Sequence, residues 1–197
     1  MFWEQDSDSG YYRIWLSQEE VGLLLDRTDD RMQQLAFELG ARCGLRSKEI
    51  LQVAPADLRD TTAGKMLVVD SAKSDDQRQT PVPGELAARI ETVGEVRDIS
   101  TVEPVIDAST RTLRRWISGV CSDIAYSDDT QYGEMWQYVS MHDLRRTWAT
   151  SLKGEDVDAM LVCDWGGWNS LDTFLEHYRG VFAPDAQRKQ RDKVGWL

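Results

Sequence analysis

Apolar residues recur at every third or fourth position through most of this chain, a spacing typical of amphipathic helices. The stretch from about Asp30 to Gly44 is the plainest case. Its apolar stripe would consist of Met32, Leu35, Ala36, Leu39 and Cys43. Just before it, "SQEE" at 17–20 places Ser and Glu three positions apart, which predicts a capping box and the start of an earlier helix.

The same spacing predicts most of the remaining elements. Ser47 is placed to cap a short helix that ends before Pro55. Longer helices are predicted through residues 84–91, 109–125, 143–152, 156–165 and 170–178. In the helix at 109–125, the inward positions would be Leu113, Trp116, Ile117, Val120 and Ile124, which leaves Arg111, Arg114 and Arg115 largely on the outer side.

Other stretches break the helical pattern. Residues 65–70 and 78–83 are typical of two strands joined by a polar segment, and residues 127–140 of a loop. Residues 1–16 are expected to be a poorly ordered lead-in, residues 17–180 one domain, and residues 181–197 a tail. The predicted fold class is α+β, mostly α, with helices around a small antiparallel β-sheet.

Composition narrows the class of protein. A chain of 197 residues with 41% hydrophobic and 29% charged residues can fold around one well-filled core. No apolar run approaches the roughly 20 residues needed to cross a bilayer, and the acidic start lacks the sections of a signal peptide. We therefore expect a cytoplasmic protein with no membrane partner. Three scattered Cys and two His form no metal-ligand pattern, so no metal, disulfide framework or cofactor is predicted.

The charge balance bears on the partner. Asp and Glu number 34 against 23 Lys and Arg, which gives a formal net charge of −11. Phosphate binding draws on Lys and Arg, so the balance lowers the expectation of a nucleic-acid partner. Net charge governs long-range fields and solubility, however, and leaves a local cationic site possible. Acidic surfaces also suit concentrated salt, and a halophilic, haloarchaeal source is a hypothesis from this composition.

Two short stretches gather cationic side chains despite the acidity. In "GLRSKEI", Arg46 and Glu49 are three apart and would share a helical face, so the carboxylate can orient the guanidinium. In "MHDLRRTWAT", His142 and Arg145 are also three apart, while Arg146 would point about 100° away and is more typical of a structural contact. Taken alone, the first arrangement is more typical of an ordinary surface ion pair. The second is more typical of a capping His beside a solvated Arg.

The order of these stretches is more specific than any one of them. An Arg after Gly-Leu, a Lys in the hairpin segment "SAKS", the His-x-x-Arg of "HDLRRT", a Gly-Trp, and a Tyr ten residues later follow one another. This arrangement resembles the catalytic domain of the tyrosine recombinase (phage integrase) family. The resemblance runs from "WLSQEEVGLLL" to Tyr178 and implies the fold of that domain.

The resemblance also implies roles for single residues. Arg46 and Arg145 would hold the non-bridging oxygens of the scissile phosphate, and Glu49 would support Arg46. Tyr178 would be the nucleophile. His142 would assist proton transfer.

Three further implications concern the remaining positions. Lys73 would be the general acid for the leaving 5′-hydroxyl, with Lys65 as the fallback, because the Lys73 loop lacks the Gly-Lys-Gly that relatives often have. Trp168 stands where many relatives have His, and its indole N–H could donate to a phosphate oxygen. Additional DNA contacts are expected from Arg146, Arg111, Arg114 and Arg115.

The implied function is site-specific cleavage and rejoining of double-stranded DNA through a covalent 3′-phosphotyrosyl bond, without metal or ATP. Several copies would assemble on DNA as a homo-oligomer. The family's N-terminal DNA-clamping domain is not expected, since only about 16 residues precede the first helix. Two alternatives remain open: a non-catalytic DNA-binding protein with the same fold, and a helical interaction module that never meets nucleic acid.

Overall fold

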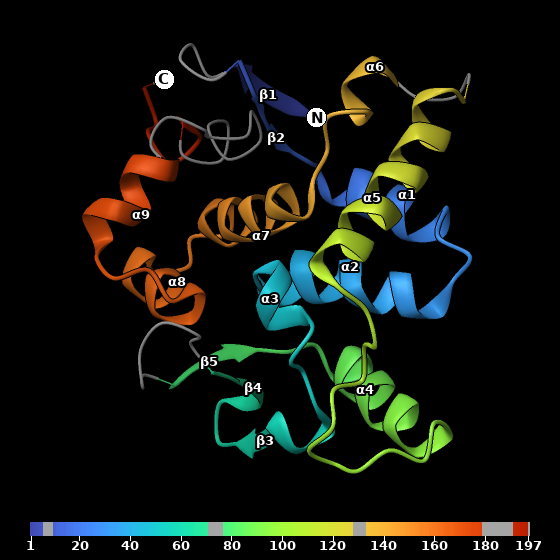
Figure 1. The fold of residues 1–197 in the computed structure, drawn as a ribbon. Coiled ribbons are helices and arrows are strands. Elements are labelled where there is room, and N and C mark those ends of the chain that lie inside the picture. Colours follow the sequence, from blue (N-terminus) through green and yellow to red (C-terminus); the bar gives the residue numbers. More distant parts are fainter. Residues whose placement is uncertain (6–9, 71–76, 128–132, 179–190, 197) are drawn as a thin grey trace.

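The computed structural model describes residues 1–5, 10–70, 77–127, 133–178 and 191–196 of the chain. Its main core lies among α1 (Gln18–Asp26), α2 (Arg31–Cys43), α4 (Gly84–Val96), α5 (Thr110–Ala125) and α7 (Met141–Gly154). The helix α2 is central, because it contacts the other four (Figure 1) and is buried from Leu35 to Ala41. The apolar stripes predicted for α2 and α5 both face this core.

The helix starts follow the predicted caps with one exception. Ser17 and Glu20 form the predicted capping box, with Ser17 N–H donating to Glu20 Oε2 at 2.7 Å. The short helix α3 (Ser47–Ile50) was expected to be capped by Ser47, and this is wrong by one residue. Its N-cap is Arg46, whose backbone N–H donates to Glu49 Oε2 at 2.7 Å, because a Glu at the third helical position can reach back.

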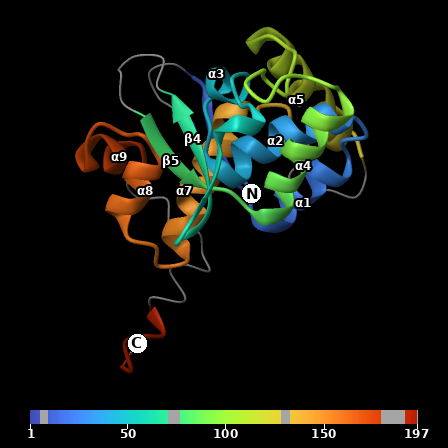
Figure 2. The ribbon, with the colours of Figure 1, turned by 90° about the horizontal axis from the view of Figure 1, so that it is seen from below.

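A three-stranded antiparallel sheet follows α3 and the 3₁₀ turn Pro55–Asp57. Its order is β3 (Leu58–Thr61), β4 (Gly64–Asp70), β5 (Gln77–Pro81), with Val69 opposite Arg78. The two predicted strands are confirmed. The strand β3 was not predicted, because it is mostly exposed and has no alternating apolar pattern. Figure 2 shows β4 and β5 between α8 and α9 on one side and α4 on the other.

Residues 1–5 and 10–16, the described part of the expected poorly ordered lead-in, are largely folded into strands, so the expectation is wrong for them. Strand β1 (Phe2–Gln5) pairs antiparallel with β2 (Tyr12–Trp15). The ribbon is attached to α7, since the backbone N–H groups of Ile14 and Leu16 donate to Asp143 Oδ1 at 3.1 Å and Thr147 Oγ1 at 3.0 Å. Ile14 is fully buried. The partners lie about 130 positions away, and local pattern cannot reveal them.

A second, smaller apolar cluster stands beside the first. Its buried members are Trp148, Ala149, Val162, Cys163 and Phe174. They come from the second half of α7, from α8 (Ala159–Gly166) and from α9 (Leu171–Tyr178), and α8 lies against β5 (Figure 1). The three helices predicted after residue 140 are therefore confirmed. The predicted loop at 127–140 holds one short helix in its described part, α6 (Gly133–Trp136).

No helix in the described part of the chain is long and apolar enough to span a membrane.

Close packing at the end of α2 depends on one glycine. Gly44 ends α2 with a left-handed φ of 66°, and a Cβ built on it would lie 2.2 Å from Cε3 of Trp148. Backbone strain and a steric clash therefore act at the same position. By contrast, Gly119 lies in α5, exposed, with nothing within 4 Å of a built Cβ.

We predict opposite effects of one substitution at these two glycines. Gly44→Ala should lower the free energy of unfolding by about 3 kcal/mol, from left-handed strain and overpacking. Gly119→Ala should raise it by about 0.5–1 kcal/mol, because alanine is the better helix former. Urea unfolding followed by circular dichroism measures both. A Gly44→Ala protein as stable as wild type would contradict the packing described here.

Candidate active site

Arg46 is held by α3 and extends toward the end of α8. Its Nη1 donates to Glu49 Oε1 at 2.7 Å and its Nη2 donates to the carbonyl oxygen of Gly167 at 2.9 Å. The side chain is still 44% exposed, whereas the Glu49 side chain is 6% exposed. The predicted Arg46–Glu49 pair is therefore formed, and it leaves part of the guanidinium open to solvent.

A second arginine, Arg78 at the start of β5, shares the same carboxylate. Its Nη2 donates to Glu49 Oε2 at 2.6 Å and its Nη1 donates to the carbonyl oxygen of Trp165 at 2.7 Å. Burial lowers the pKa of the Arg78 guanidinium, and the charge of Glu49 opposes that shift. Arg78 was not predicted as a site residue, because neither of its partners is near it in the chain. The local signal was a cationic residue at the start of the second predicted strand.

Arg145 reaches the same region from α7. It donates to the carbonyl oxygens of Gly44 and Gly166, the latter from Nη2 at 2.6 Å. Its Cζ lies 4.1 Å from the ring centroid of Trp168, within the range of a cation–π contact. The side chain is buried, with 1% of its surface exposed.

Three arginines thus meet at the end of one helix. The consecutive carbonyl oxygens of Trp165, Gly166 and Gly167 accept from Arg78, Arg145 and Arg46 respectively. The last carbonyls of a helix have no partner within the helix and carry partial negative charge. They therefore offset the repulsion among guanidiniums that come from β5, α7 and the start of α3.

The turn after α8 is shaped for this approach. Gly167 has a left-handed φ of 65°, and a Cβ on it would lie 2.5 Å from Cδ of Arg78. Trp168 follows, and its ring lies parallel to Trp148 at 6.4 Å and edge-on to Phe174 at 5.0 Å. These contacts connect α9 to the arginine group through aromatic packing.

The structure places the other predicted site residues as follows. His142 is exposed in the first turn of α7. Lys73 lies outside the described residues, and so does most of the predicted tail at 181–197. Tyr178 is the last residue of α9. The fallback Lys65 pairs with Asp60 and Glu91 at the other end of β4 from Asp70, so the structure does not bring it to the arginines.

The candidate DNA-contact arginines differ from one another. Arg146 pairs with the buried Asp143, which also accepts from Ser140, so Arg146 stabilises the start of α7. The three on α5 are exposed, as predicted: Arg111, Arg114 and Arg115. The helix that carries them, α5, contacts α3, which begins directly after Arg46.

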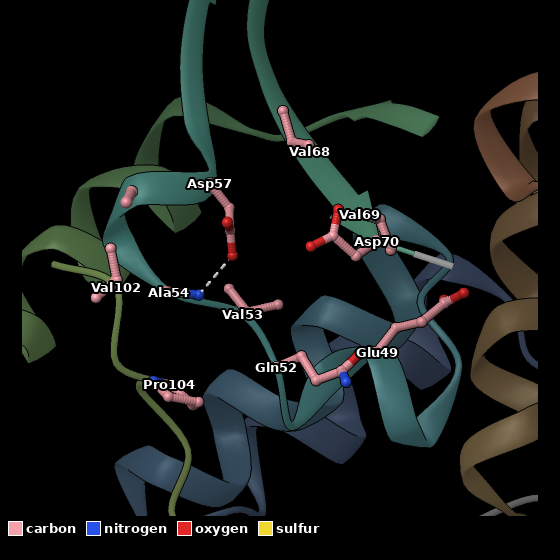
Figure 3. Close-up of a pocket in the computed structure, with 11 residues that line it drawn as sticks. Glu49, Gln52, Val53, Ala54, Asp57, Val68, Val69, Asp70, Val102 and Pro104 are labelled. Atoms are coloured by element: carbon pink, nitrogen blue, oxygen red, sulfur yellow. Dashed lines mark hydrogen bonds between the residues drawn. The ribbon is translucent and has the colours of Figure 1, made fainter. Parts of the chain in front are cut away.

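A cavity beside Glu49 lies near the site. Figure 3 shows this hollow of about 410 Å³, with Glu49, Asp57 and Asp70 around it and valines in its wall. Burial raises the pKa of Asp57, and the charge of Asp70 acts in the same direction. None of Arg46, Arg145 and Trp168 lines it. This cavity is therefore separate from the arginine group.

The cysteines take no part in this arrangement. All three are free and buried, as expected for inert thiols, and burial raises the pKa of Cys43 and of Cys121 to about 12. In the described part of the chain, no three His, Cys, Asp or Glu side chains gather in a way that could hold a metal ion.

The sequence profile of the phage integrase family matches residues 14–183, so the chain belongs to that family. No curated protein sequence matches the chain.

Solved structures share its fold. The XerA recombinase superposes with a TM-score of 0.71 at 19% identity, over 91% of this chain and 64% of that one. The Tn1549 transposon integrase in complex with transposon right-end DNA superposes with a TM-score of 0.69 at 15% identity, over 96% of this chain and 69% of that one. The catalytic domain of bacteriophage HP1 integrase superposes with a TM-score of 0.61 at 15% identity, over 93% of this chain and 95% of that one. The chain therefore spans about two thirds of the first two proteins and nearly all of the isolated catalytic domain.

We predict that Glu49→Gln destabilises the fold more than the same change at an exposed pair. The substitution leaves two guanidiniums without their shared buried charge, and it should cost about 3 kcal/mol of unfolding free energy. The control is Glu91→Gln, since Glu91 is 48% exposed and pairs with Lys65 at 3.4 Å; it should cost less than about 1 kcal/mol. Equal losses in urea unfolding would show that the Glu49 pairs contribute no more than a surface contact.

Proposed function

We propose that this chain is the catalytic part of a site-specific DNA recombinase that cleaves and rejoins strands through Tyr178. Membership of the phage integrase family and the fold shared with XerA and HP1 integrase support the proposal. The observation that carries it is the meeting of Arg46 and Arg145 at adjacent carbonyls of one helix end. Two fixed guanidiniums at one place suit a phosphodiester, whose charge grows in the transition state.

The reaction would proceed by nucleophilic attack. The Tyr178 phenol oxygen bonds to the scissile phosphorus, the bond from phosphorus to the 5′-oxygen breaks, and the leaving 5′-hydroxyl takes up a proton. A 5′-hydroxyl of another strand then reverses the step. The phosphotyrosyl bond conserves the energy of the phosphodiester, so neither ATP nor a metal ion is required.

The position of Tyr178 fits this chemistry. It follows Phe174 by four residues, so the two positions lie on the same face of α9. Phe174 is fully buried and contacts Trp168, whose ring covers Arg145. The four-residue spacing from Phe174 supports the choice of Tyr178 as the nucleophile.

The remaining roles are part of the same proposal. His142 assists proton transfer from the first turn of α7, and Lys73 is the general acid for the leaving oxygen. Trp168 holds the Arg145 guanidinium by its ring and offers its indole N–H to the phosphate. Glu49 orients Arg46.

We further propose that the chain acts on double-stranded DNA as a homo-oligomer, in the cytoplasm. The solved complexes of the Tn1549 integrase contain DNA, and XerH recombinase was solved with its palindromic substrate after cleavage. An acidic chain that binds DNA through a local cationic face would work best where salt screens its net charge, so a halophilic source fits the proposal.

Tyr178→Phe should abolish covalent attachment to DNA, because the ring keeps its shape and loses the attacking oxygen. The assay incubates protein with a random library of nicked duplexes that trap covalent intermediates, at low and at molar salt. A denaturing gel reveals DNA-shifted protein, and sequencing of the attached strands gives the cleavage site. The matched control is Tyr126→Phe, since Tyr126 is 80% exposed after α5. An adduct formed by Tyr178→Phe would remove Tyr178 from the role.

Arg114→Gln should weaken DNA binding to the same extent for every DNA sequence, because a phosphate contact does not depend on the base. If Arg114 meets one phosphate, the slope of log K against log[salt] should fall by about 1 in magnitude. Arg31→Gln is the control, because Arg31 is exposed at the start of α2. Fluorescence anisotropy with a labelled duplex from 0.1 to 1 M salt measures both slopes. Identical slopes for wild type and Arg114→Gln would take α5 out of the interface.

One observation favours the alternative of a DNA-binding protein without turnover. Arg145 is 1% exposed, with two donors on carbonyl oxygens and a tryptophan ring over its guanidinium. A phosphate would reach the Arg145 guanidinium only at its exposed edge, or after the Trp168 ring moves away. Salt-dependent DNA binding by wild type with no adduct on any duplex would support this alternative.

A further inference from the structure

We infer that Arg78 is a positioning residue for the phosphate-binding guanidinium of Arg46. The inference rests on the proposed function and assigns a role to a residue that the sequence resemblance left out. Arg78 acts through Glu49 and through the end of α8, and it need not touch DNA.

The contacts form a closed ring. The guanidiniums of Arg46 and Arg78 donate to Glu49 Oε1 and Oε2, at 2.7 Å and 2.6 Å respectively. Each also donates to the end of α8, Arg78 to the Trp165 carbonyl and Arg46 to the Gly167 carbonyl, at 2.7 Å and 2.9 Å. Arg78 thus holds Glu49 through Oε2, which also accepts from the Arg46 backbone N–H, and it holds the carbonyl run that binds the other end of the Arg46 guanidinium.

Charge gives Arg78 a second effect. Arg46 and Glu49 together are neutral, and such a pair attracts a phosphate weakly. Arg78 restores one net positive charge to the group of three at a distance set by the shared carboxylate. It also draws electron density from Glu49 Oε2, so the carboxylate competes less strongly with a phosphate for Arg46.

Burial explains why an arginine is suited to this position. The Arg78 side chain is 11% exposed and passes within 2.5 Å of where a Cβ of Gly167 would lie. Its planar fork donates in two directions at once, to a carboxylate and to a carbonyl. A lysine supplies a single compact ammonium on a flexible stem and is not equivalent at a site with two separate acceptors.

The first test observes Arg46 directly and needs no DNA. Nitrogen-15 spectra of arginine side chains separate guanidiniums that rotate slowly from those that rotate freely, and Arg46→Lys assigns the Arg46 signals. We expect separate, slowly exchanging Nη–H signals for Arg46 in wild type. They should merge or disappear in Arg78→Met and in Arg78→Lys.

The matched control is Arg89→Met, which also removes an arginine paired with a largely buried glutamate, Glu38, away from the site. It should leave the Arg46 signals unchanged. Arg78→Lys keeps the charge and most of the side-chain volume, so it tests the inference even if Arg78→Met fails to fold. Arg46 signals that stay as in wild type in a folded Arg78 variant overturn the inference, and so does a freely rotating Arg46 in wild type.

The second test measures the consequence for catalysis. On a nicked duplex that traps the covalent intermediate, single-turnover adduct formation should slow by about 10²-fold in Arg78→Lys, as for a small misplacement of a group that binds the reacting phosphate. The dissociation constant for intact duplex should change less than threefold, and Arg89→Met should react at the wild-type rate. A rate in Arg78→Lys equal to that of Arg89→Met overturns the positioning role.

The two proposals fail in different ways. If wild type forms no adduct on any duplex, the proposed strand transfer fails, and the spectra of Arg46 still decide whether Arg78 holds it. If wild type forms an adduct and Arg78→Lys does so equally fast, strand transfer stands and the role of Arg78 is wrong.

Discussion

The structure depends on the hydrogen bonds between three guanidiniums and the last carbonyls of α8. Like charges repel, and Arg46, Arg78 and Arg145 come from three separate elements with no covalent reason to meet. The helix end supplies unpaired acceptors and partial negative charge at the spacing of consecutive residues. The same bonds connect α8, which belongs to the smaller cluster, to arginines from three other elements.

This arrangement explains how an acidic protein can hold an anion. Glu49 is shared between two arginines, and the second carboxylate that pairs with a nearby arginine, Asp143, is buried in the start of α7 with Arg146. Salt screens the exposed acidic residues elsewhere on the surface. A local field of the opposite sign survives because it is built from fixed groups at short range.

Local features were predictable from the sequence, and long-range ones were not. The capping box at Ser17, the stripe of α2 and the Arg46–Glu49 pair follow from spacings of three or four residues, and all are present. Arg78 has partners 29 and 87 positions away, and β2 is anchored to α7 about 130 positions along the chain. The contact of Trp168 with Arg145 depends on the left-handed turn at Gly167. Such contacts exist only once the helices have packed.

The attachment of β2 to α7 has a geometric consequence of its own. Two amides two residues apart on a strand are separated by about 6.7 Å, and two side chains four residues apart on a helix by about 6 Å along its axis. Ile14 and Leu16 meet Asp143 and Thr147 because these two repeats nearly coincide. Because both bonds depend on the same alignment, sliding α7 by a single residue along β2 would break both of them together. The pairing with β2 thus fixes the position of α7, and with it Arg145, along the helix axis.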